Sequence, residues 1–273
     1  MDEVGDAAPS TPVEGNPGGS GSGSRRRKWL IAGIVVAVVL VGAVAGAVYW
    51  YVDRDNPEAV SLDEAVESLD DSDEPADTTQ GSAAPAESEL DGTWVVDTSV
   101  GEFSFGESTA SFLGFRVGEE LTIIGANEAV GRTPVVSGSM ELSGTEVTSA
   151  TIEGDLTAIV SDESRREQRI QDSLETGTYP TATFVLTQPI ELGSIPSEGE
   201  AVDVTAVGDL TIHGVTQSVE VPLEGQRTGN LLVVVGSLEI TFADYGVETP
   251  TAPVVLSVDD HGTVELQLFF ARA

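Results

Sequence analysis

Side chains that could do chemistry are scarce in this chain. There is no cysteine, and the only histidines are His213 and His261. A chain without thiols forms no disulfide, no thiolate metal site and no cysteine nucleophile. Arg165, Arg166 and Arg169 are closely spaced and could together meet a polar or phosphate headgroup. The alternative is a solvated helix face whose arginines pair with nearby acids.

Neither histidine has the neighbours of a catalytic group. His213 precedes Gly214 at an expected strand end, where it would bond backbone groups of the turn; contact with a ligand headgroup is the alternative. His261 follows two aspartates and precedes Gly262, a hairpin-tip pattern that predicts exposure. Adjacent acids such as Glu119 and Glu120 point apart on a strand. We therefore expect neither an enzyme nor a metal site.

Charge limits the partners further. The 273 residues include 46 acidic and 12 basic ones, a formal net charge of −34. Nucleic-acid phosphates would repel such a chain, so we expect no nucleic-acid partner.

The N-terminal part reads as a tail and a membrane anchor. Residues 1–28 are polar and end in the basic run Arg25 to Lys28, and residues 29–52 carry no charge. A helix of that length covers about 36 Å, enough to cross a bilayer, and aromatic residues stand at both of its ends. The basic run predicts a cytoplasmic N-terminus, a single pass through the cell membrane and an extracytoplasmic C-terminal part. The alternative is a cleaved signal peptide.

The rest of the chain divides into a linker and a folded domain. Residues 53–92 hold 14 acids and one base, which predicts a disordered, extended tether. Residues 93–273 hold 28 acids and seven bases, a net charge of −21, and are long enough for one core. In the predicted anchor, Gly42 and Gly46 form a GxxxG step, which leaves a homodimer open.

Alternation of apolar and polar residues makes the domain all-β. Four segments are apolar at every second position, as in antiparallel strands with one dry face. They are 150–160, 201–213, 217–224 and 263–272. Residues 161–174 lack Gly and Pro and predict a short helix capped by Ser161 or Asp162, and 181–187 predicts a further strand.

Two motifs carry a family resemblance. The run GDLTIHGVT at 208–216 is similar to the G-x-L-T-[IL]-[HN]-G-V-T run of the YceI-like family, and YPTATF at 179–184 resembles that family's Y-P-x-[AS]-T-F. Their order and separation also fit, and the resemblance extends from residue 92 to the C-terminus. Two stretches depart from it: 165–174 lacks the family's helix histidine, and 110–117 replaces its usual N-terminal strand pattern.

The resemblance implies an eight-stranded antiparallel lipocalin-like barrel with a short helix, whose apolar cavity binds isoprenoid lipids or quinones. A barrel of that size can hold one slender ligand. Strand alternation supplies the candidate cavity residues, and an ordinary packed core is the alternative. The candidates are Phe103, Phe105, Phe112, Phe115, Phe184, Leu210, Ile212, Leu268 and Phe270. The headgroup candidates are Arg165, Arg166, Arg169 and His213.

These observations predict a membrane-anchored, extracytoplasmic carrier or store for a long-chain isoprenoid amphiphile, with no cofactor other than that lipid. The acidic surface favours a nearly neutral headgroup, such as a quinone, over a polyprenyl phosphate. Two other functions stay open: a solid β-domain displayed for protein contacts, and an enzyme acting on an isoprenoid. A hollow barrel would favour the carrier, and a filled one would favour the displayed module.

Overall fold

The computed structural model describes residues 56–70, 90–122, 125–249 and 255–273. Within these ranges no helix is long and apolar enough to span a bilayer. The predicted anchor at 29–52 and the tail before it lie outside the described residues, as does most of the predicted linker.

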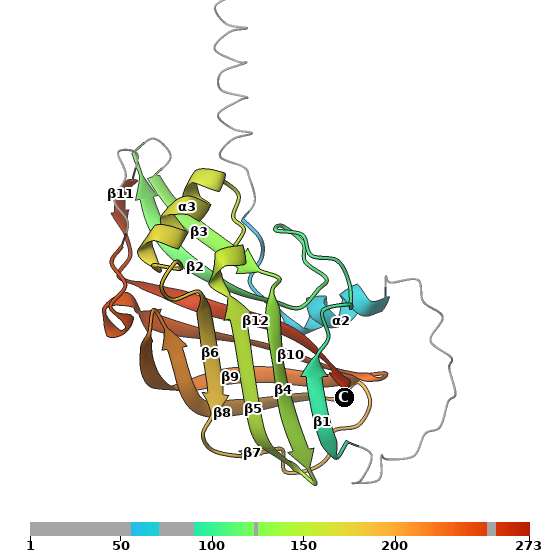
Figure 1. Ribbon diagram of the computed structural model, residues 1–273. Coiled ribbons are helices and arrows are strands. Elements are labelled where there is room, and N and C mark those ends of the chain that lie inside the picture. Colours follow the sequence, from blue (N-terminus) through green and yellow to red (C-terminus); the bar gives the residue numbers. More distant parts are fainter. Residues whose placement is uncertain (1–55, 71–89, 123–124, 250–254) are drawn as a thin grey trace, which may run out of the picture. The chain divides into compact units, whose positions relative to one another are not determined.

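Eight antiparallel strands close a barrel (Figure 1). In ring order they are β1 (Gly92–Val96), β4 (Val136–Ser143), β5 (Glu146–Asp155), β6 (Thr181–Leu186), β8 (Ala201–Ile212), β9 (Val215–Thr228), β10 (Leu231–Thr241) and β12 (His261–Arg272). Closure comes from β1 and β12, where Trp94 stands opposite Arg272 and Val96 opposite Phe270. The expected all-β barrel is thus confirmed.

Four further strands extend the sheet beyond this ring. They are β2 (Phe112–Leu121), β3 (Gly125–Thr133), β7 (Ile190–Glu191) and β11 (Val255–Val258). β2 pairs with residues 263–267 of β12, on the edge whose other end pairs with β1. β2 also pairs with β3 and β11, so this group continues the wall at one end of the barrel.

The predicted helix is α3 (Ser164–Ser173), and two short 3₁₀ turns, η2 (Leu156–Ala158) and η3 (Phe242–Tyr245), interrupt the strands. Glu163 occupies the N-cap position of α3 without a side-chain cap. The strand expected to reach residue 160 ends at Asp155, because that carboxylate accepts a hydrogen bond from the Thr157 N–H at 2.8 Å and caps η2.

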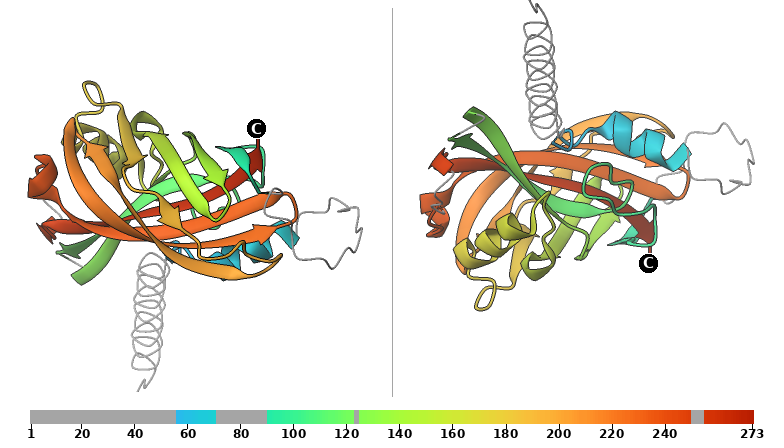
Figure 2. Two further views of the ribbon diagram at one scale, coloured as in Figure 1. Left: turned by 90° about the horizontal axis from the view of Figure 1, so that it is seen from below. Right: turned by 90° about the horizontal axis from the view of Figure 1, so that it is seen from above.

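The main departure from expectation lies in the predicted linker. Residues 62–70 form a helix, α2 (Leu62–Asp70), that lies along the outer side of β9 and β10 (Figure 2). Its buried side chains are Leu62 and Ala65, which pack against Val233, Val235 and Phe269. Apolar residues at 62, 65, 66 and 69 follow helical spacing. The sequence predicts at most a transient helix over residues 56–71, whereas in the structure residues 56–70 pack on the domain and are not part of a free tether.

Candidate functional site

The two faces of β10 and β12 differ in an unexpected way. Outward side chains of these strands are covered: Val233 and Phe269 have no exposed surface, and Glu265 is 1% exposed. Covering comes from α2, from residues 56–60 and from the loop 97–111, where the Gln267 side-chain amide donates to the Ser108 and Ala110 carbonyls at 3.1 Å. The outer face of this wall is therefore covered at Val233, Val235, Glu265, Gln267 and Phe269, whereas Ser237 and Glu239 of β10 stay exposed.

Some inward side chains on the same strands keep part of their surface accessible, whereas Leu232, Leu268 and Phe270 are buried. Val234 lies between the buried Val233 and Val235, yet it is only half-buried. Leu266 lies likewise between the buried Glu265 and Gln267 and is half-buried. Because the outer side is sealed at these positions, their accessible surface must face the interior. Val234 and Leu266 therefore keep accessible apolar surface while they pack against the interior cluster.

Packed side chains form two clusters in the interior. One interior cluster gathers Trp94, Met140, Leu142, Leu232, Leu268 and Phe270. A second cluster gathers Leu210, Ile212 and Tyr245, against which Leu174, Phe184, Leu238 and Val264 pack. The two clusters are densely packed and made almost entirely of apolar side chains. The accessible residues Val234 and Leu266 pack against the first of them.

Inward-facing glycines widen the interior unequally. Gly208 lies under the ring of Phe184, and a Cβ built at this glycine would come within 2.4 Å of that ring. At Gly225, opposite Val234 on β10 and Val202 on β8, the nearest atoms to a built Cβ lie at 3.7 Å and 4.0 Å. A Cβ at Gly225 would therefore meet its neighbours at ordinary contact distances. The space next to Gly208 is already filled by the ring of Phe184.

Six of the predicted cavity residues lie on the inner face. Phe115 stands opposite Val264 and over Gly131, and Phe184 stands opposite Leu210. The other inward residues are Leu210, Ile212, Leu268 and Phe270.

Three predicted cavity residues lie outside the barrel. Phe112 pairs with Gln267, so it points to the outer face, where the Arg132 guanidinium lies 4.5 Å from its ring centroid. Phe103 and Phe105 belong to the loop 97–111, and the Phe105 carbonyl accepts from Arg132 Nη1 at 3.2 Å. Phe112 and Phe115 are three positions apart on β2 and therefore point to opposite faces, and Phe103 and Phe105 lie in a loop where no strand alternation applies.

The headgroup candidates occupy different environments. Arg166 is engaged by Glu119 at 2.8 Å and by Asp162. Arg165 is exposed and Arg169 half-buried on the same helix. His213 adopts a left-handed conformation with φ +53°, donates from Nδ1 to the Tyr245 carbonyl at 3.1 Å and meets the Tyr179 ring edge-on. Arg166 therefore pairs with nearby acids, as the alternative to headgroup binding described, whereas His213 bonds the backbone of η3 and not that of its own turn.

Sequence reasoning missed one polar group in the interior. Tyr245, in η3, is 2% exposed and packs among the inward residues Leu210 and Ile212. Its hydroxyl finds no hydrogen-bond partner among the residues that the structure describes. Burial, with a smaller contribution from Asp244, raises the pKa of Tyr245, so the hydroxyl stays protonated at neutral pH and can donate. No periodic pattern signals a tyrosine that follows a strand in a 3₁₀ turn.

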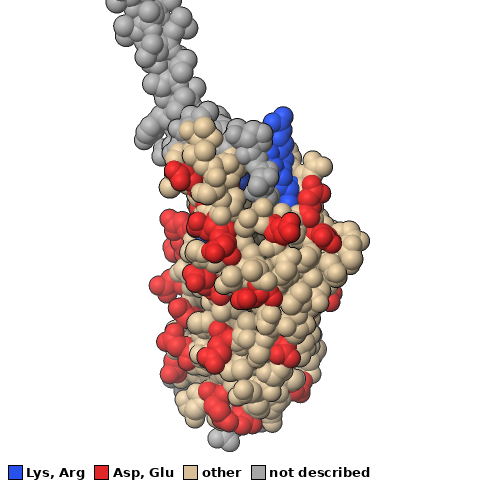
Figure 3. Space-filling model, turned by 90° about the vertical axis from the view of Figure 1, so that its left-hand side faces the viewer, with Lys and Arg blue, Asp and Glu red and all other residues tan. Residues whose placement is uncertain are grey.

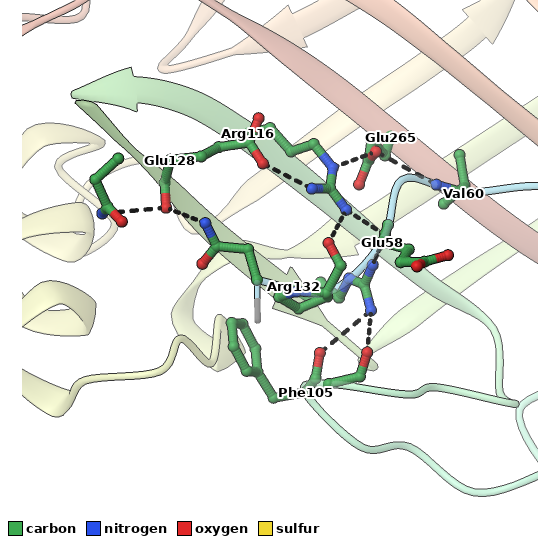
Figure 4. A network of polar contacts seen from close by, with 11 residues as sticks. Glu58, Val60, Phe105, Arg116, Glu128, Arg132 and Glu265 are labelled. Carbon is green, nitrogen blue, oxygen red and sulfur yellow. Dashed lines mark hydrogen bonds and ion pairs between the residues drawn. The ribbon is translucent and has the colours of Figure 1, made fainter. Parts of the chain in front are cut away.

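A buried ionic network holds residues 56–60 on the outer face (Figure 4). Arg116 Nε donates to Glu265 Oε1 at 2.6 Å, and its Nη2 donates to the Pro57 carbonyl at 2.6 Å. Arg132 Nη2 donates to the Glu58 carbonyl at 2.7 Å. Burial lowers the pKa of Arg132, and the nearby Glu265 opposes this change. We call residues 56–70, which pack on the outside of the barrel, the docked segment. The network therefore holds the start of this segment on β2, β3 and β12.

Comparison with known proteins agrees with this geometry. A polyisoprenoid binding domain from Saccharophagus degradans is 23% identical and covers 67% of this chain and 99% of its own, with a TM-score of 0.50. BcnA from Burkholderia cenocepacia is 22% identical and covers 58% of this chain and 95% of its own, with a TM-score of 0.44. No curated protein matches the chain. The model of the YceI-like domain matches residues 94–270, which include both sequence motifs and every strand of the barrel except the first residues of β1 and the last of β12. The chain therefore belongs to the YceI-like domain family.

Proposed function

We propose that this protein holds a long-chain isoprenoid amphiphile inside its barrel, for transport or storage. The observation that carries the proposal is the accessible apolar surface of the inward side chains Val234 and Leu266, whose neighbours along each strand are covered on the outer face. The structural likeness to a polyisoprenoid binding domain supports the same ligand class. Each buried CH₂ contributes about 0.8 kcal/mol, so a tail of several isoprene units binds tightly without polar contacts.

Charge and the interior hydroxyl together favour a nearly neutral headgroup. The folded domain carries 28 acids against seven bases. On the face shown in Figure 3, carboxylates spread along its length while basic side chains gather at one end. Such a surface repels phosphates. The Tyr245 hydroxyl, by contrast, can donate a hydrogen bond to a quinone carbonyl.

The ligand preference has a direct test. The full chain would be solubilised from membranes with a mild detergent and purified, and its bound lipids extracted and identified by mass spectrometry. We expect isoprenoid quinones or other neutral isoprenoids. A preparation that carries mainly polyprenyl phosphates would refute the neutral headgroup, and one that neither carries nor takes up an isoprenoid would leave the solid displayed β-domain as the better description.

The Tyr245 hydroxyl gives a second prediction. Tyr245→Phe is expected to weaken quinone binding about 5- to 10-fold, which corresponds to one lost hydrogen bond of about 1 kcal/mol. Binding of squalene, an isoprenoid hydrocarbon without a headgroup, should not change. Titration of both ligands into detergent-solubilised protein measures the two affinities.

Stability supplies the control for this variant. Because the hydroxyl has no partner within the described part of the chain, its removal should not lower the free energy of unfolding. A destabilised Phe variant with unaltered quinone affinity would mean that the hydroxyl serves the protein and not the ligand.

The membrane location is also part of the proposal. Residues 29–52 would anchor the chain in the cell membrane with the barrel outside the cytoplasm. Only three residues separate this stretch from Asn56, whose side-chain amide donates to the Glu128 carbonyl on β3 at 2.9 Å. Loss of membrane association on deletion of 29–52 tests the anchor; continued association would refute it.

A further inference from the structure

The barrel wall changes its pairing between β9 and β10. β9 pairs with β8 along most of its length, from Val215 to Gln226. Its pairing with β10, however, runs only from Thr228 opposite Leu231 to Leu223 opposite Gly236. From Ser237 to Thr241, β10 continues to pair with β12. Residues 215–222 of β9 and 237–241 of β10 therefore border a seam without a backbone ladder between them.

Pro222 supplies a physical cause for the seam. A proline has no N–H to give to a ladder and is tolerated in sheets where one side of the strand is an edge. Pro222 is the first β9 residue beyond the last pair with β10, while it still stands opposite Thr205 of β8. On its β10 side, β9 therefore behaves as an edge strand from this proline onward.

Charge also opposes closure. If the register of Leu223 and Gly236 continued, Glu220 would stand opposite Glu239, and both are exposed. Like charges directly opposite destabilise strand pairing. At the far end of the seam, the Gln217 side-chain amide donates to the Asp244 carbonyl of η3 at 2.7 Å.

An apolar layer and an open pocket adjoin the seam. On the inner side, Val219, Leu238 and Ile240 pack with Leu210 and Tyr245 by side-chain contact. At the Pro222 end, an open pocket of about 420 Å³ is lined from both strands and by Val60 of the docked segment. The strand residues that line it include Pro222, Leu223, Gly236 and Ser237. Along the seam, the side chains of β9 and β10 can separate without breaking backbone hydrogen bonds. Separating two paired strands elsewhere in the wall would break such bonds.

We propose that the seam between β9 and β10 is the lateral portal through which the hydrocarbon tail of the ligand enters the barrel. This inference rests on the proposed function and specifies its route. The tail passes between apolar side chains, while Glu220 and Glu239 at the lips repel a phosphate headgroup. Residues of η3 lie at the far end of the portal, where Tyr245 packs among the apolar side chains.

The absence of cysteine permits a clean cross-linking test. Glu220→Cys with Glu239→Cys would be joined by a short, reducible bis-methanethiosulfonate linker. The matched control joins Asp209→Cys with Ser218→Cys, which stand opposite each other on the fully paired strands β8 and β9. Both pairs go into a full chain carrying Trp29→Phe and Trp50→Phe, so that Trp94 of the interior cluster is the single tryptophan.

Uptake would be followed as quenching of Trp94 fluorescence after addition of an isoprenoid quinone to the protein in neutral phosphatidylcholine nanodiscs. The seam cross-link should slow quenching at least tenfold, reduction should restore it, and the control cross-link should leave it unchanged. Mass spectrometry verifies that each linker has formed.

Each other outcome has a distinct meaning. An unaltered rate across a closed seam, or equal slowing by both cross-links, overturns the portal while the proposed function stands. Failure of the uncross-linked protein to bind the quinone at all overturns the proposed function and the portal with it.

Discussion

Gly225→Phe is expected to lower the affinity for a long isoprenoid quinone by about a hundredfold. The new ring would project from β9 into the interior opposite Val234 and occupy the room of several methylene groups of the tail. At about 0.8 kcal/mol for each buried CH₂, exclusion of three or four such groups removes about 3 kcal/mol of binding free energy. Titration calorimetry with the detergent-solubilised full chain measures the change.

Two variants control this result. Gly225→Ala adds only a Cβ whose nearest neighbours lie at ordinary contact distances, so it should bind nearly as the parent does. Gly208→Ala would drive a Cβ into the Phe184 ring and should unfold more easily. If folded Gly225→Phe protein binds the quinone with parental affinity, the interior beside Val234 is not the tail site.

Glu265→Gln is expected to lower the free energy of unfolding by about 3–5 kcal/mol. Glu265 is 1% exposed, and Arg116, whose side chain is 10% exposed, donates to it at 2.6 Å. The buried guanidinium of Arg132 lies in the same network, and Glu265 is among the groups that favour its charged form. Removing the buried charge leaves Arg116 with the 42%-exposed Glu128 as its remaining ionic partner and takes from Arg132 a neighbouring charge that favours its charged form, and loss of one partner of a buried pair is strongly destabilising. Urea unfolding followed by circular dichroism measures the loss.

Glu128→Gln is the matched control, because Glu128 pairs with the same arginine at 2.8 Å but is 42% exposed. An exposed carboxylate is solvated and contributes about 0–1 kcal/mol. Equal losses in the two variants would show that burial does not set the strength of this network. The variant at Glu265 should also loosen residues 56–60, since the Val60 N–H donates to the same carboxylate oxygen at 3.4 Å. Faster amide exchange there would report that loosening.

Several strands could be predicted closely because their signal is local. Period-2 alternation predicts β8 and β12 to within two residues, because apolar inward side chains alternate with mostly polar outward ones, and 181–187 predicts β6 to within one residue. Side-chain direction was assigned well in regular strands, as at Leu210, Ile212, Leu268 and Phe270. It failed at Phe112, whose strand follows a loop where no alternation sets the register.

The seam and the docked segment have weaker sequence signals. Pro222 lies within an otherwise regular strand and indicates that one side of the strand is an edge. A proline does not show, however, which of the two neighbouring strands is unpaired there. The apolar residues of α2 are diluted by acids, and their partners Val233 and Phe269 are far away in sequence. Their packing depends on long-range contacts that no local window contains.

The all-β class, the family and the direction of most strand side chains follow from alternation and from two ordered motifs, which are local properties of the chain. Tertiary contacts are needed to show that β10 and β12 are covered on the outside at Val233 and Phe269 while Val234 and Leu266 stay accessible, that a tyrosine hydroxyl is buried among apolar side chains, and that the β9–β10 ladder stops at Pro222. The reason is physical: an apolar strand face has the same residue pattern whether it lines a space or fills one. That difference depends on what distant segments bring against it.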